Sequence, residues 1–178
     1  MKQHYIELLK STKRKGIDKL IKWLKTTDFF TAPASTKYHL SRPEGLLDHS
    51  MHVLDNLICE DEGHDMETLI IVALLHDICK VNCYVKSEKN VKKDNEWVKE
   101  SYYIMEDQFP IGHGEKSVIL IQQFISLTEE EIAAIRWHMG AYEPKENYNT
   151  LGKVFNKYPL ALYLHIADLK ATYIDEKE

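Results

Sequence analysis

The run Thr68–Lys80, which reads TLIIVALLHDICK, constrains the fold of this chain more than any other segment. It predicts one helix over about 66–80 that is apolar on nearly every side, and such a helix must be buried at the centre of a fold. The helix nevertheless ends in His76, Asp77 and Lys80. Buried titratable groups are costly unless something compensates them. A bound metal ion is the compensation that best suits a histidine next to an aspartate.

The rest of the chain predicts helices around that segment. Apolar residues recur at helical spacing, and glycines and prolines mark the breaks. The expected helices span about 3–14, 17–26, 45–59, 66–80, 113–126, 128–139, 151–157 and 159–175. Between them, residues 81–110 place β-branched and aromatic residues among charges, which predicts a β-hairpin that turns at 93–95. We therefore expect an all-α bundle with a β-hairpin inserted at about 81–110.

Length and composition favour one soluble domain. With 178 residues, 44% of them hydrophobic and 29% charged, the chain can bury a sizeable core, so we expect a single domain over 1–178 with helices of 1–28 packed on it. No apolar run is long enough for a membrane span, and the N-terminus lacks the apolar region of a signal peptide. Three cysteines without a CxxC pair predict free thiols and a cytoplasmic location.

The charge is unevenly distributed. The formal net charge is -5, which argues against a protein coated with nucleic acid. Residues 1–25 nevertheless hold eight basic groups against two acidic ones. A solvated helix face is the favoured interpretation of this segment, and a surface for a phosphate backbone is the alternative.

Five segments each carry a residue that can bind a metal, set among apolar neighbours. The residues are Asp48-His49, His76-Asp77, His113 within Gly112–Glu115, His138 and Asp168. Taken singly, each has an ordinary explanation as a hydrogen-bonded core residue. Taken together they favour one site, because several helices would otherwise bury ligand-type residues for unrelated reasons. A second His-Asp pair, His64-Asp65, lies in a polar stretch, where we expect a solvated loop with Asp65 as a helix cap.

The order His49, His76-Asp77, Asp168 resembles the signature of the HD-domain metal-dependent phosphohydrolase superfamily. The segment ALLHDICK is similar to its LLHDIGK motif. His113 in GHGEKS and His138 in IRWHMG match the two further histidines of the dinuclear members. The opening segment APASTKYHLSRPEGLLDHSMHV resembles most closely one branch, the bacterial 3′-to-5′ exoribonucleases that join an OB fold to an HD domain. The resemblance covers residues 29 to about 170.

The chain departs from that pattern at three places. Cys79 stands where the motif has glycine, and its thiol either tunes or inhibits bound metals or simply packs. Glu44-Gly45 replaces a double glycine. The OB fold has no counterpart, since the 28 residues before the resemblance are too few to form one, and this argues against processive RNA degradation.

The resemblance implies roles for individual residues. It implies two divalent transition metal ions, of manganese, iron, cobalt, nickel or zinc. One ion would be held by His49, His76, Asp77 and Asp168, and the other by the shared Asp77 with His113 and His138. Lys80, on the same predicted helix face as Asp77, would neutralise a phosphate oxygen, unless it merely caps the helix end.

Three further residues have weaker indications. His39 and Arg42, in the loop before the first ligand, suit binding of a substrate phosphate or protonation of a leaving group. A plain surface position is the alternative for Arg42. Glu115 would orient a ligand or a water molecule, unless it is only an exposed residue of a first helical turn. His52 and His165 have no assigned role and are expected to pack.

These inferences predict a metal-dependent phosphohydrolase of the HD type. We expect a dinuclear phosphodiesterase that acts on a nucleotide or a short oligonucleotide, with single-stranded nucleic acid as a further candidate partner and no membrane partner. The alternatives are a phosphomonoesterase of the 5′-nucleotidase type, a di-iron oxygenase, and a nucleotide-binding module without catalysis. Metal content and the absorption of oxidised protein would identify an oxygenase, and nucleotide affinity that survives chelation would identify a binding module.

Overall fold

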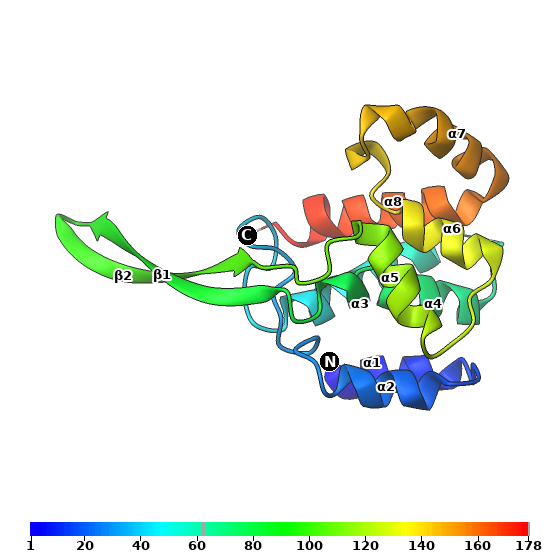
Figure 1. Cartoon of the computed structure of the whole chain (residues 1–178), viewed down its shortest axis with the longest axis horizontal. Coiled ribbons are helices and arrows are strands. Elements are labelled where there is room, and N and C mark those ends of the chain that lie inside the picture. The colour runs from blue at the N-terminus through cyan, green and yellow to red at the C-terminus, as the bar shows by residue number, and fades with distance from the viewer. Residues whose placement is uncertain (62, 178) are drawn as a thin grey trace.

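Helix α4 (Met66–Leu75) lies inside a bundle of helices from which a two-stranded hairpin projects (Figure 1). The computed structural model describes residues 1–61 and 63–177. The other helices are α1 (Lys2–Ser11), α2 (Ile17–Leu24), α3 (Gly45–Glu60), α5 (His113–Gln122), α6 (Glu129–Trp137), α7 (Tyr148–Lys157) and α8 (Pro159–Lys170). The fold is thus mostly helical with an inserted hairpin, as predicted.

Helix α4 is the core of the bundle. Every residue from Leu69 to Leu75 is buried, and the helix contacts α1, α3 and α6. Asp65 caps its start by accepting a hydrogen bond of 2.8 Å from the backbone N–H of Thr68, as predicted. In the described residues no helix is long and apolar enough to cross a membrane. The apolar run therefore fills a core that other helices cover.

The predicted single helix over 66–80 is wrong at its C-terminal end. Helix α4 stops at Leu75, and a separate 3₁₀ turn, η1 (Ile78–Lys80), follows. Side chains satisfy the last carbonyls of α4: the Tyr5 hydroxyl donates to Leu74 at 2.6 Å, and Nδ1 of His76 bonds Ala73 at 2.8 Å. Asp77 lies between α4 and η1 with φ of −102° and ψ of 15°, outside the helical conformation, and it is buried.

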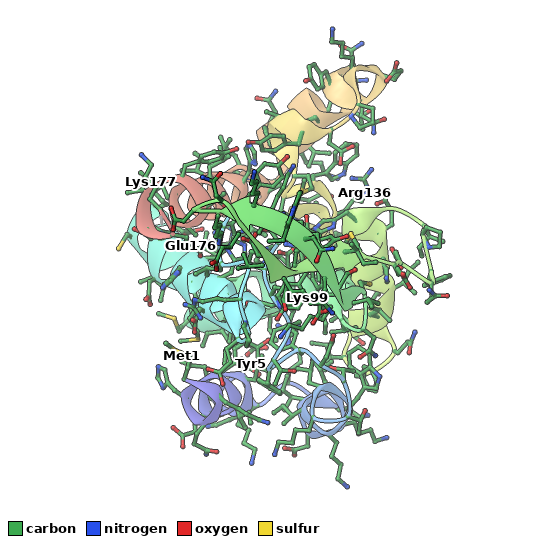
Figure 2. The ribbon with its side chains drawn as sticks, turned by 90° about the vertical axis from the view of Figure 1, so that its left-hand side faces the viewer. Met1, Tyr5, Lys99, Arg136, Glu176 and Lys177 are labelled. Carbon is green, nitrogen blue, oxygen red and sulfur yellow. The ribbon has the colours of Figure 1, made fainter. Side chains whose placement is uncertain are left out.

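Strands β1 (Tyr84–Lys93) and β2 (Glu96–Met105) form an antiparallel ribbon that points away from the helices (Figures 1 and 2). The register runs from Tyr84 opposite Met105 to Lys93 opposite Glu96. Asp94 and Asn95 make the turn with φ of +50° and +67°. Two consecutive left-handed residues match the right-handed twist of paired strands, and asparagine and aspartate tolerate that conformation. The predicted hairpin is confirmed, with shorter strands than its predicted limits.

The remaining predicted helices exist, with shifted limits. Helix α5 ends at Gln122, before the predicted 126, and α7 begins at Tyr148, before the predicted 151. The helix predicted over 159–175 divides into α8 and a π-helical turn, η4 (Ala171–Asp175). The wider turn brings the next residue, Glu176, back against α3 (Figure 2). The capping box of Thr128 and Glu131 at the start of α6 is confirmed.

Candidate metal centre

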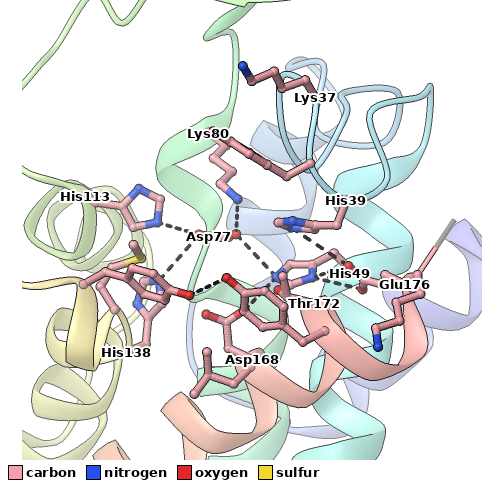
Figure 3. Close-up of a pocket in the computed structure, with 16 residues that line it drawn as sticks. Lys37, His39, His49, Asp77, Lys80, His113, His138, Asp168, Thr172 and Glu176 are labelled. Atoms are coloured by element: carbon pink, nitrogen blue, oxygen red, sulfur yellow. Dashed lines mark hydrogen bonds and ion pairs between the residues drawn. The ribbon is translucent and has the colours of Figure 1, made fainter.

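Five of the six residues predicted as metal ligands line one cavity of about 740 Å³, and the sixth, His76, is buried next to Asp77 (Figure 3). They come from five places: His49 on α3, His76 and Asp77 after α4, His113 at the start of α5, His138 after α6, and Asp168 on α8. The volume lies within the range of about 300–1,000 Å³ that is usual for small-molecule sites. The fold therefore gathers, from helix ends and helix faces, all six residues that the sequence singled out.

His76 and His138 occupy equivalent positions. Each follows the last residue of a helix, and its Nδ1 lies 2.8 Å and 2.7 Å, respectively, from the carbonyl oxygen three residues earlier. Donation from Nδ1 leaves Nε2 of each ring as the nitrogen that can bind a metal. The two Nε2 atoms lie 3.5 Å and 3.6 Å from the carboxylate of Asp77.

Asp77 is the centre of the cluster. Its Oδ1 lies 2.7 Å from Nε2 of His113, and its Oδ2 lies 2.6 Å from Nζ of Lys80. Oδ2 also lies 3.7 Å from Nε2 of His49. Burial opposes the ionised carboxylate, but Lys80 and the neighbouring histidines outweigh burial and lower the pKa of Asp77 well below its usual range. Asp77 is thus a buried carboxylate with histidines on both sides.

His49 lies between two carboxylates. Its Nε2 is 3.1 Å from Oδ1 of Asp168, and its Nδ1 is 3.0 Å from Oε1 of Glu176. Burial would lower the pKa of His49, but the hydrogen bonds with Asp168 and Glu176 raise it to about 9. The same contact lowers the pKa of Asp168 far below its usual value despite burial. Asp168 and Glu176 therefore fix the orientation of the His49 ring from opposite edges.

The donor atoms fit divalent transition metal ions. Nε2 of His76 is buried and has no hydrogen-bond partner among the described residues. Burial lowers the pKa of His76 to about 4, so its ring is neutral near pH 7 and this nitrogen offers a lone pair. Donor atoms lie within 4.8 Å of one another in four overlapping groups of the described residues: His39, His49 and Glu176; His49, His76 and Asp168; His76, Asp77 and His138; and Asp77, Cys79 and His113. Imidazole with carboxylate suits the metals that the sequence predicted.

The other predicted site residues divide into two sets. His39 and Lys80 line the cavity, and the His39 ring centre lies 5.0 Å from that of His49. Arg42 does not line the cavity: it is half-exposed and pairs with Asp48 at 2.7 Å. Glu115 also lies outside the cavity and pairs with Arg136 at 2.6 Å.

Sequence reasoning missed Glu176. This residue is buried, and its carboxylate contacts His52 at 2.9 Å as well as His49. It lies 127 residues from His49 in the sequence, in the charged segment Asp175–Lys177, which gave no signal of burial. The contact also explains His52, which shares a face of α3 with His49. His165 has a structural contact as well, with Nδ1 2.7 Å from the His138 carbonyl oxygen.

Comparison with known families agrees with this geometry. The family model described as the HD domain matches residues 46–173, well over half of the chain. Comparison with the curated proteins and with the solved structures gave no significant match. The matched range contains all six of the converging histidines and aspartates. The chain therefore belongs to the HD domain family, the superfamily of metal-dependent phosphohydrolases.

Proposed function

We propose that this protein is a dinuclear phosphodiesterase that hydrolyses a nucleotide or a short oligonucleotide. The position of Asp77 is the observation that carries the proposal. Its Oδ1 faces His113 and His138, while its Oδ2 faces His49 and His76. A carboxylate with histidine nitrogens around each oxygen is suited to bridge two cations, and one cation would leave half of these donors without a function.

The two ions would have different protein ligands. His49, His76, Asp77 and Asp168 would hold one, and Asp77, His113 and His138 would hold the other. Together the ions would supply an acidified water and neutralise the charge on the attacking and leaving oxygens of a displacement at phosphorus. In hydrolysis the water oxygen forms a bond to phosphorus, one phosphorus–oxygen ester bond breaks, and the leaving oxygen receives a proton to replace the one that the water gives up.

Lys80 and His39 would bind the phosphate. Pairing with Asp77 raises the pKa of Lys80 against the effect of burial, so its ammonium group stays charged in the cavity wall. A fixed cation there stabilises negative charge on phosphate oxygens. Both ring nitrogens of His39 are buried without a hydrogen-bond partner, and burial lowers its pKa. The neutral His39 ring can donate one N–H to a phosphate oxygen.

The rim of the cavity supports a nucleotide as the substrate. Tyr38, Tyr142 and Tyr173 line it, and each is more than half exposed. Exposed aromatic rings stack on nucleobases, which is worth roughly 1–3 kcal/mol per base. Lys37 and Lys177 also line the cavity and place positive charge beside these rings. The combination suits a ligand that carries both a base and a phosphate.

The assay compares diesters with monoesters. Protein stripped with chelator and reloaded with manganese, cobalt or zinc is tested on bis(p-nitrophenyl) phosphate, p-nitrophenyl phosphate, dinucleotides and 5′-mononucleotides. We expect hydrolysis of the diesters that depends on metal and exceeds hydrolysis of the monoesters. Faster hydrolysis of 5′-mononucleotides would support a nucleotidase instead. The absence of hydrolysis with every metal and every ester would contradict the proposal.

Replacing His113 with alanine is expected to remove the second ion and leave the first. His113 contacts only the Oδ1 side of Asp77, so its replacement should remove part of the several kcal/mol of charge stabilisation that bound cations supply to the transition state. We therefore expect diesterase activity to fall by about 100-fold. Metal content by plasma mass spectrometry and kcat/KM on bis(p-nitrophenyl) phosphate provide the measurement. His4→Ala, at an exposed position of α1, is the matched control. Unchanged diesterase activity in His113→Ala would rule out the dinuclear assignment.

Glu176→Ala is expected to weaken metal binding without removing a ligand. Removing a carboxylate that hydrogen-bonds a metal-binding histidine typically lowers metal affinity by about 10–100-fold. Glu176 contacts Nδ1 of His49, the ring edge away from Asp168. Competition with a fluorescent chelator measures the affinity, and Asp175→Asn, at the exposed neighbour, is the control. Equal affinity in Glu176→Ala and wild type would show that Glu176 has no part in positioning His49.

A further inference from the structure

The β-hairpin extends the protein beyond its helical core. Strands β1 and β2, of ten residues each, project from the helices as a two-stranded ribbon (Figure 1). Every residue from 92 to 99, around the tip, is exposed. A two-stranded ribbon is marginally stable by itself, and it offers two faces to solvent. The two faces of this ribbon carry different side chains.

The pairing register assigns each side chain to a face. Residues directly opposite each other share a face, and successive pairs alternate between the two faces. One face, named here the Trp97 face, carries Tyr84, Lys86, Lys92, Trp97, Lys99 and Tyr103. The contact of Lys99 with Glu88 at 3.1 Å on this face agrees with the assignment. So does the contact of Lys89 with the Tyr102 ring on the opposite face, at 5.3 Å from the ring centre.

The lysines of the two faces have different surroundings. On the opposite face, Lys89 and Lys93 both pair with Glu100, at 3.7 Å and 2.9 Å. On the Trp97 face, Lys86 and Lys92 have no carboxylate partner among residues 1–61 and 63–177. The Trp97 face therefore carries positive charge that the protein itself does not neutralise, and such charge attracts a polyanion.

Aromatic rings stand beside these two lysines. Trp97 is 72% exposed and lies directly opposite Lys92. Nearer the helices, Tyr103 lies directly opposite Lys86, and its ring centre is 6.4 Å from that of Tyr84. A ring stacks on a nucleobase, and a lysine neutralises a phosphate of the backbone. Each of the two cross-strand pairs thus offers both groups that bind one nucleotide of a single strand.

The Trp97 face begins beside the metal centre. The Tyr84 hydroxyl donates to the carbonyl oxygen of Ala34 at 3.0 Å, and Nζ of Lys80 donates to the same oxygen at 2.8 Å. Lys80 lines the cavity, and the loop that contains Ala34 also contributes Tyr38 and His39 to it. A strand that lies along this face would therefore lead toward the cavity.

We propose that the Trp97 face of the hairpin binds single-stranded nucleic acid and guides it to the metal centre. The proposal rests on the proposed phosphodiesterase and narrows its substrate to a single strand that reaches from the hairpin to the cavity. Bases would stack on Trp97 and Tyr103, and phosphates would contact Lys86 and Lys92. Binding would have little sequence preference, because every base has a face on which a ring can stack.

Fluorescence anisotropy measures the binding. The full-length protein is titrated into a labelled phosphorothioate oligothymidylate of about 16 nucleotides, the upper end of known single-strand site sizes. Phosphorothioate keeps the charge of the backbone and resists hydrolysis. We expect a Kd between about 10⁻⁶ and 10⁻⁴ M at physiological salt, the usual range of binding without sequence preference.

Replacing Trp97 with alanine tests the stacking. The Kd should rise at least about fivefold, the lower end of the effect of losing one stacked base. Trp97→Phe keeps a ring and should bind more tightly than Trp97→Ala. Val98→Ala, at the next residue of β2 on the opposite face, is the matched control and should bind like wild type.

The variants Lys86→Ala and Lys92→Ala test the charge. Each should lower the slope of log K against log salt concentration by about 0.7, the effect of one phosphate contact with a single strand. Lys93→Ala is the matched control, because Lys93 follows Lys92 in β1 but lies on the opposite face and pairs with Glu100. Its salt dependence should equal that of wild type.

Equal affinity in wild type and Trp97→Ala would overturn the proposal. A salt slope that is unchanged in both lysine variants, or no binding by wild type at about 10⁻⁴ M protein, would overturn it as well. So would a wild-type dimer that Trp97→Ala converts to monomers without any binding of the oligonucleotide, because the face would then belong to a second copy of the chain.

Hydrolysis of bis(p-nitrophenyl) phosphate by the same preparation separates this proposal from the proposed function. Hydrolysis by a protein that does not bind the oligonucleotide would overturn the hairpin surface alone. Binding that depends on Trp97, in a protein that hydrolyses no ester with any metal, would support the surface and contradict the phosphodiesterase.

Discussion

Replacing Asp77 with asparagine is expected to lower kcat/KM for bis(p-nitrophenyl) phosphate by at least about 10³-fold. Bound cations stabilise the transition state by several kcal/mol, and each 1.36 kcal/mol of lost stabilisation lowers the rate by a factor of ten. The carboxylate lies between the two groups of histidines, so both of the proposed ions would lose a charged ligand at once. Asparagine keeps the shape of the side chain and can still accept from Lys80. The measurement uses wild type and variant reloaded with the same metal.

The matched control is Asp55→Asn, an exposed aspartate on α3, the helix that also carries His49. Its activity and metal content should equal those of wild type. Far-ultraviolet circular dichroism of both variants establishes that they fold. Activity of Asp77→Asn within tenfold of wild type would contradict a catalytic centre built on this carboxylate.

Replacing Arg14 with alanine is expected to lower the free energy of unfolding by about 3–5 kcal/mol, the usual effect of breaking a buried ion pair on one side. Two nitrogens of the Arg14 guanidinium contact the two carboxylate oxygens of Glu131 at 2.8 Å and 3.0 Å. Glu131 is 0% exposed, and Arg14 also pairs with Glu67 at 2.5 Å. Without Arg14, the Glu131 carboxylate stays buried with no cation paired to it among residues 1–61 and 63–177. Urea unfolding in the presence of chelator measures the loss.

Lys15→Ala is the control for that experiment. Lys15 is the neighbouring basic residue and is exposed, so its replacement should change the free energy of unfolding by less than about 0.5 kcal/mol. A loss below about 1 kcal/mol in Arg14→Ala, the upper range for exposed pairs, would show that the pair acts like a surface salt bridge.

Local signals in the sequence predicted most of the fold. The apolar run before His76 identified α4, and the capping box of Thr128 and Glu131 identified the start of α6. Both signals depend on residues that are close together in the chain. The hairpin was predicted for the same reason, since Asp94 and Asn95 suit a tight turn between two strand-like runs. Helix limits were less accurate, because tertiary contacts such as that of Tyr5 with Leu74 decide them.

Only part of the site was predicted, because some of its contacts join residues that lie far apart in the sequence. Its histidines and aspartates stand among apolar residues, and burial of such groups is a signal that a sequence can carry. Contacts across the fold leave no such signal. Glu176 reaches His49 from the position just after η4, and Arg14 reaches Glu131 across 117 residues. Cys79 follows Asp77 by two residues in sequence, yet the direction of its sulfur depends on how η1 packs against α5.

The position of bound metal tests the central claim most directly. Crystals of wild-type protein grown with Mn²⁺ and measured at the manganese absorption edge would locate each ion by its anomalous scattering. We expect two peaks about 3.5–4 Å apart on either side of Asp77. One should contact His49, His76 and Asp168, and the other His113 and His138. An anomalous map without a peak beside Asp77, in crystals that contain manganese elsewhere, would contradict the dinuclear phosphodiesterase.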